Sequence, residues 1–552
     1  MNRYFPLANQ LGSYDRKWLS GDIAAAITVW AIVVPESMAY ASVAGMPPET
    51  GLYAATIPLL AYASFGSSRR VTMGPSAAVA ALSFATVAPF VAAGSDEFVG
   101  LTVVVALIVG VVLILAGIAR LGVIADFLSE PVLKGFIVGV ALTIVVGQAS
   151  KLFGIEIEAD GFFQEILELI RNLSETNAET LILGAGSLTA LFVLERFVKR
   201  IPAALLVVIG SILVVKLFDL TAAGVEVAGE IPSGLPTFAV PRVGWEVLLG
   251  LIPGAIGVAI VVYGESMALA KTFSSKHGER VDANQELIAL GAGNMAGGLF
   301  GAFVTEASNS RSAAADAAGQ NTQVASLMTG ALLVVTLLFL TSLFADLPDA
   351  ALGAIVIHAV LGLIRFGPIR ALWFRNKVDF WAAAATLVGV LVFDVLVGLM
   401  VGVVVSLFGL MRRVVRPRIT WLGLDLESGL FNPRATPGVQ EVPGIAIVHI
   451  AIELFFANVG VFRDEVLAEV ARSQPRYVVI DGEAISDIDT TAVDEIGKLE
   501  EELSKLGVTL VFARLDSEVR AALSAGGVSL GGLEYGRVID AVEALRGQPP
   551  AQ

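Results

Sequence analysis

The chain has 552 residues, of which 56% are hydrophobic and only 16% are charged. Soluble globular domains carry roughly 25% charged residues, so this composition excludes a wholly soluble protein. The net charge of −15 and the absence of a basic patch argue against nucleic-acid binding. There is no cysteine, and the three histidines lie far apart, which excludes disulfides, thiolate metal sites and a zinc-type ligand spacing. We therefore predict an integral membrane protein that is not an enzyme and that uses no cofactor or metal.

In chain order, residues 1–21 are predicted to be a cytoplasmic N-terminal segment. They lack the short apolar core and small-residue cleavage site of a signal peptide. Between residues 22 and 411, apolar runs of about 20 residues follow one another, and each is long enough to cross a bilayer as a helix. We predict that the range 22–411 is the transmembrane domain.

The charges between the apolar runs predict the orientation. Basic residues such as Arg69 and Arg70, and the cluster that begins at Arg412, fall on alternate sides of successive runs, whereas the intervening loops are acidic, as at Asp96 and Glu97. Because basic loops stay in the cytoplasm, we predict an even number of crossings and two cytoplasmic termini. The expected location is the cell inner (plasma) membrane.

A tetrapeptide repeats within the apolar region. The sequence Glu-Ser-Met-Ala begins at Glu36 and again at Glu265, and each copy is followed by Ser-Ala-Ala, at Ser76 and at Ser312. Two matches in the same order indicate two halves that are built alike, although coincidence in a chain rich in alanine and glycine is the alternative. Paired halves with a glutamate inside the hydrophobic zone are typical of transporters with repeats inverted across the membrane.

Each Ser-Ala-Ala segment is predicted to start an interrupted helix after an extended stretch. In the first half, Pro75 stands where a helix can begin, since the first turn does not need its missing N–H. In the second half, Ser308, Asn309 and Ser310 can cap the helix that follows. A helix that starts inside the membrane points its free N–H groups and its positive dipole end into the protein. Two such helices facing each other form an anion site.

Arg311 lies beside the second cap and adds a full positive charge. A buried arginine in a membrane is costly unless it is used, which favours contact with an anion. The alternative is that Arg311 only neutralises Glu36 or Glu265. A carboxyl group removed from water binds a proton more readily, so both glutamates suit proton binding during a transport cycle. Their alternative role is as static partners of Arg311 or of the helix N-termini.

The pattern changes after residue 411. The range 412–442 is rich in proline and glycine and is predicted to be a linker. Residues 443–552 alternate between strand-like and helix-like segments, which predicts a cytoplasmic α/β domain.

Several of these stretches resemble one family. The segment Pro35-Glu36-Ser37-Met38-Ala39-Tyr40-Ala41, the pair Gly74-Pro75 and the later Arg311-Ser312-Ala313 are similar to the sulfate permease (SulP) family, whose animal relatives include prestin and pendrin. The C-terminal part resembles the STAS domain of the same family. The resemblance covers nearly the whole chain, and the first motif is highly specific.

The resemblance implies an α-helical polytopic membrane protein of fourteen segments in two inverted repeats of seven, as in uracil permeases, followed by the STAS domain. It also implies a homodimer in which a core domain moves against a gate domain, with the anion held between the third and tenth segments. Glu36 and Glu265 would lie on the first and eighth segments and couple transport to protons. Carried over to this chain, the anion-binding residues are Gly74, Pro75, Ser76, Ala77, Asn309, Ser310, Arg311 and Ser312.

Bacterial relatives of the STAS domain are phosphorylated on a serine in an Asp-Ser-Ser-Gly loop. Here the loop reads Asp489-Thr490-Thr491-Ala492. Thr490 and Thr491 keep a hydroxyl and are candidate phosphorylation sites, whereas a structural helix cap is the alternative. A cytoplasmic regulator that acts through this domain is the expected partner.

Together these observations predict a secondary active anion transporter of the sulfate, bicarbonate or dicarboxylate class, coupled to protons as a symporter and working by alternating access. Its partners are a small inorganic or organic anion, protons and the lipid bilayer. The alternatives are a regulatory or motor-like membrane protein that binds anions without moving them, and an uncoupled anion exchanger or channel.

Overall fold

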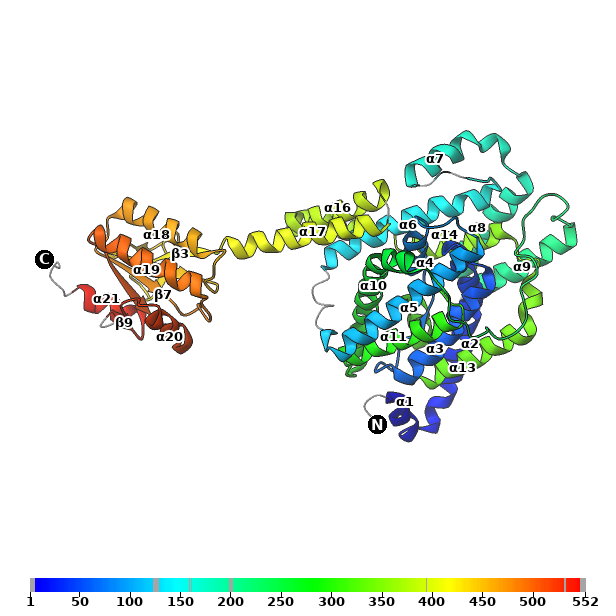
Figure 1. Ribbon diagram of the computed structural model, residues 1–552, viewed down its shortest axis with the longest axis horizontal. Helices are drawn as coiled ribbons and strands as arrows, with labels where there is room; N and C mark the ends of the chain where they lie inside the picture. Colours follow the sequence, from blue (N-terminus) through cyan, green and yellow to red (C-terminus); the bar gives the residue numbers. More distant parts are fainter. Residues whose placement is uncertain are drawn as a thin grey trace. The chain divides into compact units, whose positions relative to one another are not determined.

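The computed structural model describes residues 5–122, 129–157, 159, 161–197, 202–393, 395–530 and 533–546. The chain forms two compact units, Met1–Ser406 and Leu407–Gln552 (Figure 1). The regular elements of the first unit are helices and one pair of two-residue strands, and the second unit contains a seven-stranded sheet. The extreme ends of the predicted N-terminal segment and C-terminal domain, residues 1–4 and 547–552, lie outside the described residues.

The helical unit is built from two successive sets of elements in the same order. The first set comprises α2 (Leu19–Val43), α3 (Pro48–Phe65), β1 (Met73–Gly74) with α4 (Ala77–Val87), α5 (Asp96–Ile118), α6 (Glu130–Phe153), α8 (Ala178–Phe197) and α9 (Ala203–Phe218). The second set comprises α10 (Trp245–His277), α11 (Ala283–Leu299), β2 (Glu306–Ala307) with α12 (Asn309–Ala317), α13 (Val324–Val335), α14 (Asp349–Leu361), α16 (Lys377–Val392) and α17 (Val395–Val415). Seven segments in each set, within the described residues, agree with the predicted seven-plus-seven repeat.

Short helices outside these segments support the same repeat. Helix α7 (Phe162–Arg171) separates the fifth and sixth segments of the first set, and α15 (Phe366–Arg375) separates the fifth and sixth of the second. In α7, Phe163, Leu167 and Ile170 form an exposed apolar stripe, as expected for a helix lying along a membrane surface. The remaining short helix, α1 (Pro6–Gly12), precedes the first set.

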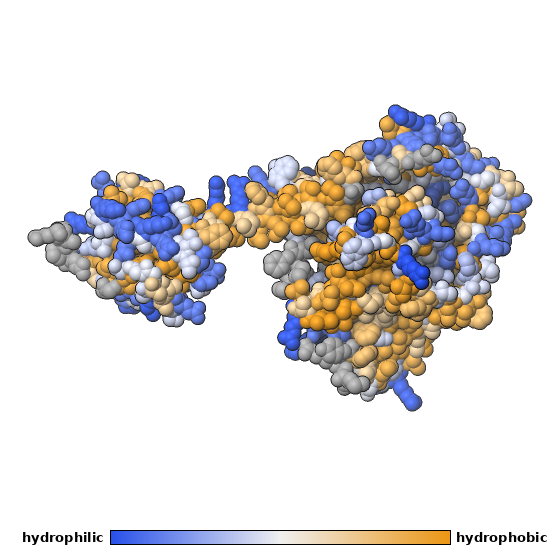
Figure 2. Space-filling view, viewed as in Figure 1, coloured by the Kyte–Doolittle hydropathy of each residue, from blue (hydrophilic) through white to orange (hydrophobic). Residues whose placement is uncertain are grey.

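The surface of the helical unit is apolar over a wide area. Among the described residues, eight helices are long and apolar enough to cross a membrane. Leu217 and Phe374 are exposed over 77% and 78% of their surface, and Figure 2 shows hydrophobic side chains gathered over this unit. Exposing an apolar surface of this extent to water is energetically unfavourable, whereas contact with lipid tails is favourable.

Glycines allow close helix packing inside the unit. At Gly291 of α11, an added Cβ atom would lie 2.7 Å from the carbonyl oxygen of Gly110 on α5, so a larger residue at this position would push the two backbones apart. Small residues at such crossings are typical of membrane helix pairs. This contact joins one segment of the first repeat to one of the second.

The second unit is a sheet covered by helices on both faces. Strands β6 (Ile445–Ile450), β7 (Tyr477–Asp481), β8 (Thr509–Ala513) and β9 (Glu534–Tyr535) are parallel, and β3 (Ile419–Asp425) pairs antiparallel with β6. Alternate strand residues pack against α18 (Val459–Ser473), α19 (Thr490–Lys505) and α20 (Ser517–Ala525) on one face and against α21 (Val538–Arg546) on the other. The predicted alternation of strands and helices is therefore present.

The range 412–442 is not the linker that its composition predicted. It contains β3 and two short strands that pair with β3, namely β4 (Phe431–Pro433) and β5 (Val439–Gln440). Some of the proline and glycine residues there, such as Pro437 and Gly438, lie in the turns between these strands, whereas Gly423 and Pro433 lie within β3 and β4. The sheet therefore begins more than twenty residues before the predicted boundary at residue 443.

Candidate anion-binding site

Strands β1 and β2 meet within the helical unit, and each leads into a short helix. They pair antiparallel, with Met73 opposite Ala307 and Gly74 opposite Glu306. Helices α4 and α12 have 11 and 9 residues, too few to cross a bilayer. Because the strands run in opposite directions, the two half-helices leave the crossing in opposite directions, and both begin close to it.

Serine hydroxyls cap both half-helices. Ser76 accepts a hydrogen bond from the backbone N–H of Val79, and Ser308 accepts one from that of Arg311. The expectation that α4 begins at Pro75 is wrong, because Ser76 is the N-cap and Pro75 precedes it. A serine can accept from an otherwise unpaired N–H of the first turn, which proline cannot do. The dipoles of both helices thus point their positive ends toward the crossing.

Arg311 lies at the crossing and is fully buried. Its Nη2 donates to the carbonyl oxygen of Pro75 at 2.6 Å, and its Nη1 lies 3.4 Å from Oε2 of Glu36 on α2. An added Cβ atom at Gly74 would lie 3.0 Å from Nη2, so glycine lets the guanidinium pack against β1. Arg311 therefore pairs with Glu36, and within the described residues no ion pair joins it to Glu265.

Two further carboxyl groups lie close to each other at the crossing. Glu265 is on α10, next to Ser266, whose hydroxyl accepts a hydrogen bond from the backbone N–H of Ala307 at 3.0 Å. Glu306, on β2, is only 2% exposed and accepts a hydrogen bond from the hydroxyl of Ser76. Glu306 was not predicted as a site residue, although an acidic residue between an apolar run and a capping serine was a usable signal.

Of the eight residues that the resemblance assigned to anion binding, Gly74 is the last residue of β1, and the others lie in the short segments after β1 and β2. Asn309 and Ser310 are exposed at the start of α12, Ser76 is half-buried, and the others are buried. Ser312 has a structural contact, because its hydroxyl accepts from the backbone N–H of Thr72 at 2.9 Å. The first turn of α12 therefore contributes the exposed polar groups of the set, and the N-cap of α4 contributes a half-buried one.

Buried carboxylates outside this cluster hold the segments that lead to it. Glu286 accepts hydrogen bonds from the hydroxyls of Tyr62 and Ser67 at 2.6 and 2.7 Å, which fixes the loop before β1. Asp22 accepts from the backbone N–H and the hydroxyl of Thr322 at 3.2 and 2.8 Å, which fixes the turn after α12. The sequence patterns gave no sign of either residue, because both partners are distant in the chain.

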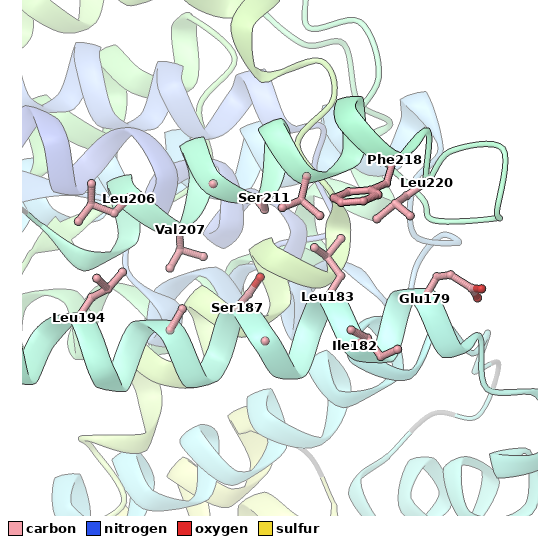
Figure 3. Close-up of a pocket in the computed structure, with 14 residues that line it drawn as sticks. Glu179, Ile182, Leu183, Ser187, Leu194, Leu206, Val207, Ser211, Phe218 and Leu220 are labelled. Atoms are coloured by element: carbon pink, nitrogen blue, oxygen red, sulfur yellow. The ribbon is translucent and has the colours of Figure 1, made fainter.

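A separate cavity of about 530 Å³ lies between α8 and α9 (Figure 3). Its walls are almost wholly aliphatic, with Ser187 and Ser211 as small polar exceptions and Glu179 at one end. None of its lining residues belongs to β1, α4, β2 or α12. An anion needs convergent hydrogen-bond donors, so we place the candidate site at the strand crossing.

In the second unit, Asp489 is the N-cap of α19 and accepts from the backbone N–H of Ala492 at 2.7 Å. Thr490 and Thr491 are exposed in the first turn of this helix. The structural cap that was the alternative role of this loop is therefore supplied by Asp489, and the two hydroxyl groups remain accessible.

The same unit carries an ionic cluster around a buried carboxylate at the carboxyl ends of three parallel strands. Asp481 is fully buried, and it accepts hydrogen bonds from Nε and Nη2 of Arg514 at 2.8 and 2.5 Å. His449 Nδ1 lies 2.8 Å from the same carboxylate. The hydrogen bond to Asp481 raises the pKa of Arg514, so this guanidinium stays charged.

Half-helices that begin at a buried strand crossing beside an arginine, inside a bundle of membrane-spanning helices, define a multi-pass membrane protein of the anion-transporter class. The chain belongs to the sulfate permease family, whose model matches residues 19–386. The STAS domain model matches residues 436–531.

The chain is similar to named proteins over nearly its whole length. It is 37% identical to a "Probable sulfate transporter" of Mycobacterium tuberculosis, covering 94% of this chain and 93% of that one. It is 31% identical to the "Sodium-independent sulfate anion transporter" of Bos taurus, covering 100% and 92%. The murine Solute Carrier 26 family member A9 anion transporter, solved in the inward-facing state, matches with a TM-score of 0.92 and 25% identity, covering 99% and 94%.

Proposed function

We propose that this protein is a secondary active transporter of an anion of the sulfate, bicarbonate or dicarboxylate class, coupled to protons and working by alternating access. The observation that carries the proposal is the meeting of two capped half-helix N-termini with Arg311 at one buried crossing. Because relatives of this chain are named as sulfate transporters, sulfate is the first anion to test.

The anion would bind at the starts of α4 and α12. The exposed Asn309 and Ser310 and the half-buried Ser76 offer polar groups that a ligand can reach. Backbone N–H groups of the two first turns supply further donors. Arg311 would add positive charge from behind, where its guanidinium already contacts Pro75.

Glu36 would carry a proton during the cycle. With Glu36 ionised, its carboxylate at 3.4 Å offsets the charge of Arg311. With Glu36 protonated, the full charge of Arg311 acts on the anion, so proton binding and anion binding favour each other. Glu265, whose Oε1 is buried without a hydrogen-bond partner in the described part of the chain, is the second proton-binding candidate.

The setting of this activity is also proposed. We expect the inner (plasma) membrane, two cytoplasmic termini and a homodimer, with the STAS domain available to a cytoplasmic regulator. Thr490 and Thr491 are exposed, which supports a role as modification sites.

Uptake by proteoliposomes tests the proposal. Labelled sulfate, bicarbonate, fumarate and chloride would each be offered with and without an inward proton gradient. We expect one anion of the sulfate, bicarbonate or dicarboxylate class to accumulate only with the gradient. Anion exchange at a rate independent of the proton gradient would instead identify an uncoupled exchanger. Saturable anion binding without any uptake would identify a regulatory or motor-like protein.

Glu36→Gln tests the coupling residue. Glutamine is close in size and its amide oxygen can still accept from Arg311, so we expect folding and anion binding to persist. Gradient-driven accumulation should be lost, because glutamine cannot titrate, whereas anion exchange should survive. Wild-type accumulation by this variant would reject Glu36 as the proton carrier, and Glu265→Gln in the same assay would then test the second candidate.

A further inference from the structure

Glu306 lies where a bound anion would find its donors. It stands opposite Gly74 in the β1–β2 pair, and its Oε1 accepts the hydrogen bond of the Ser76 hydroxyl. Ser76 is the N-cap of α4. The carboxylate of Glu306 thus accepts from a hydroxyl group at the positive end of this half-helix. The positive end of a helix is a position that favours an anion.

The other carboxylate oxygen of Glu306 has no hydrogen-bond partner in the described part of the chain. Within the described residues, Oε2 of Glu306 and Oε1 of Glu265 are both buried without a hydrogen bond, and Glu306 itself is only 2% exposed. Within the described residues Arg311 donates no hydrogen bond to it: Nη1 and Nη2 of Arg311 contact Glu36 and Pro75, and its Nε is itself buried without a partner. A buried carboxylate with one unsatisfied oxygen is unfavourable.

The charged and titratable groups around Glu306 come from three elements. Glu265 faces it from α10, Arg311 from α12, and Glu36 and Tyr40 lie behind Arg311 on α2. Strand β1 and the first turn of α4 contribute no titratable side chain, since residues 73–79 read Met-Gly-Pro-Ser-Ala-Ala-Val. Glu306 is therefore the one carboxyl group of the described residues that is hydrogen-bonded to the cap of a half-helix at the crossing.

We propose that Glu306 is a tethered competitor for the transported anion. As a carboxylate, it holds Ser76 and repels an incoming anion from the start of α4. When a proton from solvent adds to its free oxygen, the carboxyl group becomes neutral, no longer repels the anion, and releases the Ser76 hydroxyl. This inference rests on the proposed function and adds a second, local origin for proton coupling beside Glu36.

The coupling follows from linkage. If protonation of Glu306 raises the affinity for the anion, the bound anion raises the affinity of Glu306 for the proton by the same factor. Proton and anion are then taken up together, as symport requires. Glu36 acts through the charge of Arg311, whereas Glu306 acts by competing for the same donors, so substitutions at the two positions are distinguishable.

Sulfate binding to the full-length protein at pH 5.5 and pH 8 tests the competitor role. Wild-type affinity should fall by about tenfold for each pH unit over which one carboxyl group ionises. Glu306→Gln should bind sulfate at pH 8 about tenfold more tightly than wild type, with little change at pH 5.5. Unchanged or weaker binding by Glu306→Gln at pH 8 would overturn the proposal. Glu36→Gln is the matched control, and it should retain the part of the pH dependence that Glu306 causes.

A second measurement does not depend on the identity of the substrate. Because the chain has no cysteine, Ser310→Cys places a single thiol at the exposed start of α12. The rate of its modification by a sulfonate-bearing thiol reagent, divided by the rate for a neutral reagent, should rise at pH 8 when Glu306→Gln is added. If the Glu306→Gln variant fails to fold, Glu306→Thr is used in its place.

The two measurements separate the two proposals. If no protein binds sulfate but the reagent ratio rises, sulfate is not the substrate and the competitor role stands. If sulfate binds and the ratio does not change with Glu306→Gln or Glu306→Thr, anion binding stands and Glu306 is not the competitor.

Discussion

The two units of this chain differ in how completely a buried carboxyl group is hydrogen-bonded. In the sheet, both oxygens of Asp481 are held by Arg514, and His449 adds a third contact. At the strand crossing, Glu306 is almost equally buried, yet only one of its oxygens has a hydrogen bond among the described residues. A fully partnered carboxylate stabilises a single arrangement of its neighbours. A half-partnered one is unfavourable in the folded state, and such strain is retained where a site uses it.

The sharpest test of this contrast compares Asp481→Asn with Glu306→Gln. Removing one partner of a buried ion pair costs roughly 3–5 kcal/mol. Arg514 keeps Glu483 as a partner at 2.5 Å, so we expect Asp481→Asn to destabilise the second unit by about 3 kcal/mol. Glu306→Gln should change the stability of the helical unit by less than about 1 kcal/mol, since glutamine keeps an acceptor for Ser76. Thermal unfolding of the full-length variants measures both, and equal losses would remove the contrast.

Arg311→Ala should have the next largest effect. Loss of a charge-assisted hydrogen bond weakens anion binding by about 2 kcal/mol, or about 30-fold. The variant also leaves Glu36 without its partner, so stability must be separated from binding. The double variant Arg311→Ala with Glu36→Gln removes that stranded charge. We expect it to restore stability but not affinity in calorimetric titrations. Full recovery of affinity would mean that Arg311 only neutralises Glu36.

Truncation should have the smallest effect on anion affinity. All the proposed binding residues precede residue 406, so a chain that ends at Val415, the last residue of α17, should bind the anion with affinity within about twofold of the full chain. Removing residues 443–552 is the informative control. It deletes β6 and leaves β3 with an exposed edge, which favours aggregation. A folded, monodisperse Val415 truncation that binds no anion would show that the site assignment is incomplete.

Sequence reasoning located the repeats, and it placed the half-helix starts to within a residue or two, because local chemistry determines both. The two Glu-Ser-Met-Ala copies mark corresponding helices, α2 and α10. Ser76 and Ser308 are N-caps because each serine hydroxyl accepts from a backbone N–H only three residues further along the chain. The meeting of the two half-helix starts at one crossing was likewise expected from the two Ser-Ala-Ala segments, whereas the anion-binding role of the residues there stays a prediction. These features need only local spacing.

The contacts that join the halves could not be predicted from spacing. Arg311 pairs with Glu36, which is 275 residues away in the chain, and Ser76 pairs with Glu306, which is 230 residues away. The local sequence around these residues does not indicate which distant residue each will contact. The prediction that residues 412–442 form a linker was wrong for a related reason. Strands as short as β4 and β5 form only because they pair with β3. Tertiary pairing decides such cases.

The β1–β2 ladder has only two residue pairs, yet it makes each repeat incomplete without the other. The backbone N–H of Ser308 donates to the carbonyl oxygen of Thr72 at 2.9 Å, so the second half-helix is anchored on the strand of the first repeat. A fragment ending after α9 would hold one half-helix, one unpaired strand and no arginine at the crossing. The smallest piece of this chain that could form the proposed anion site is therefore a pair of repeats, because each repeat supplies one half-helix and one strand of the crossing.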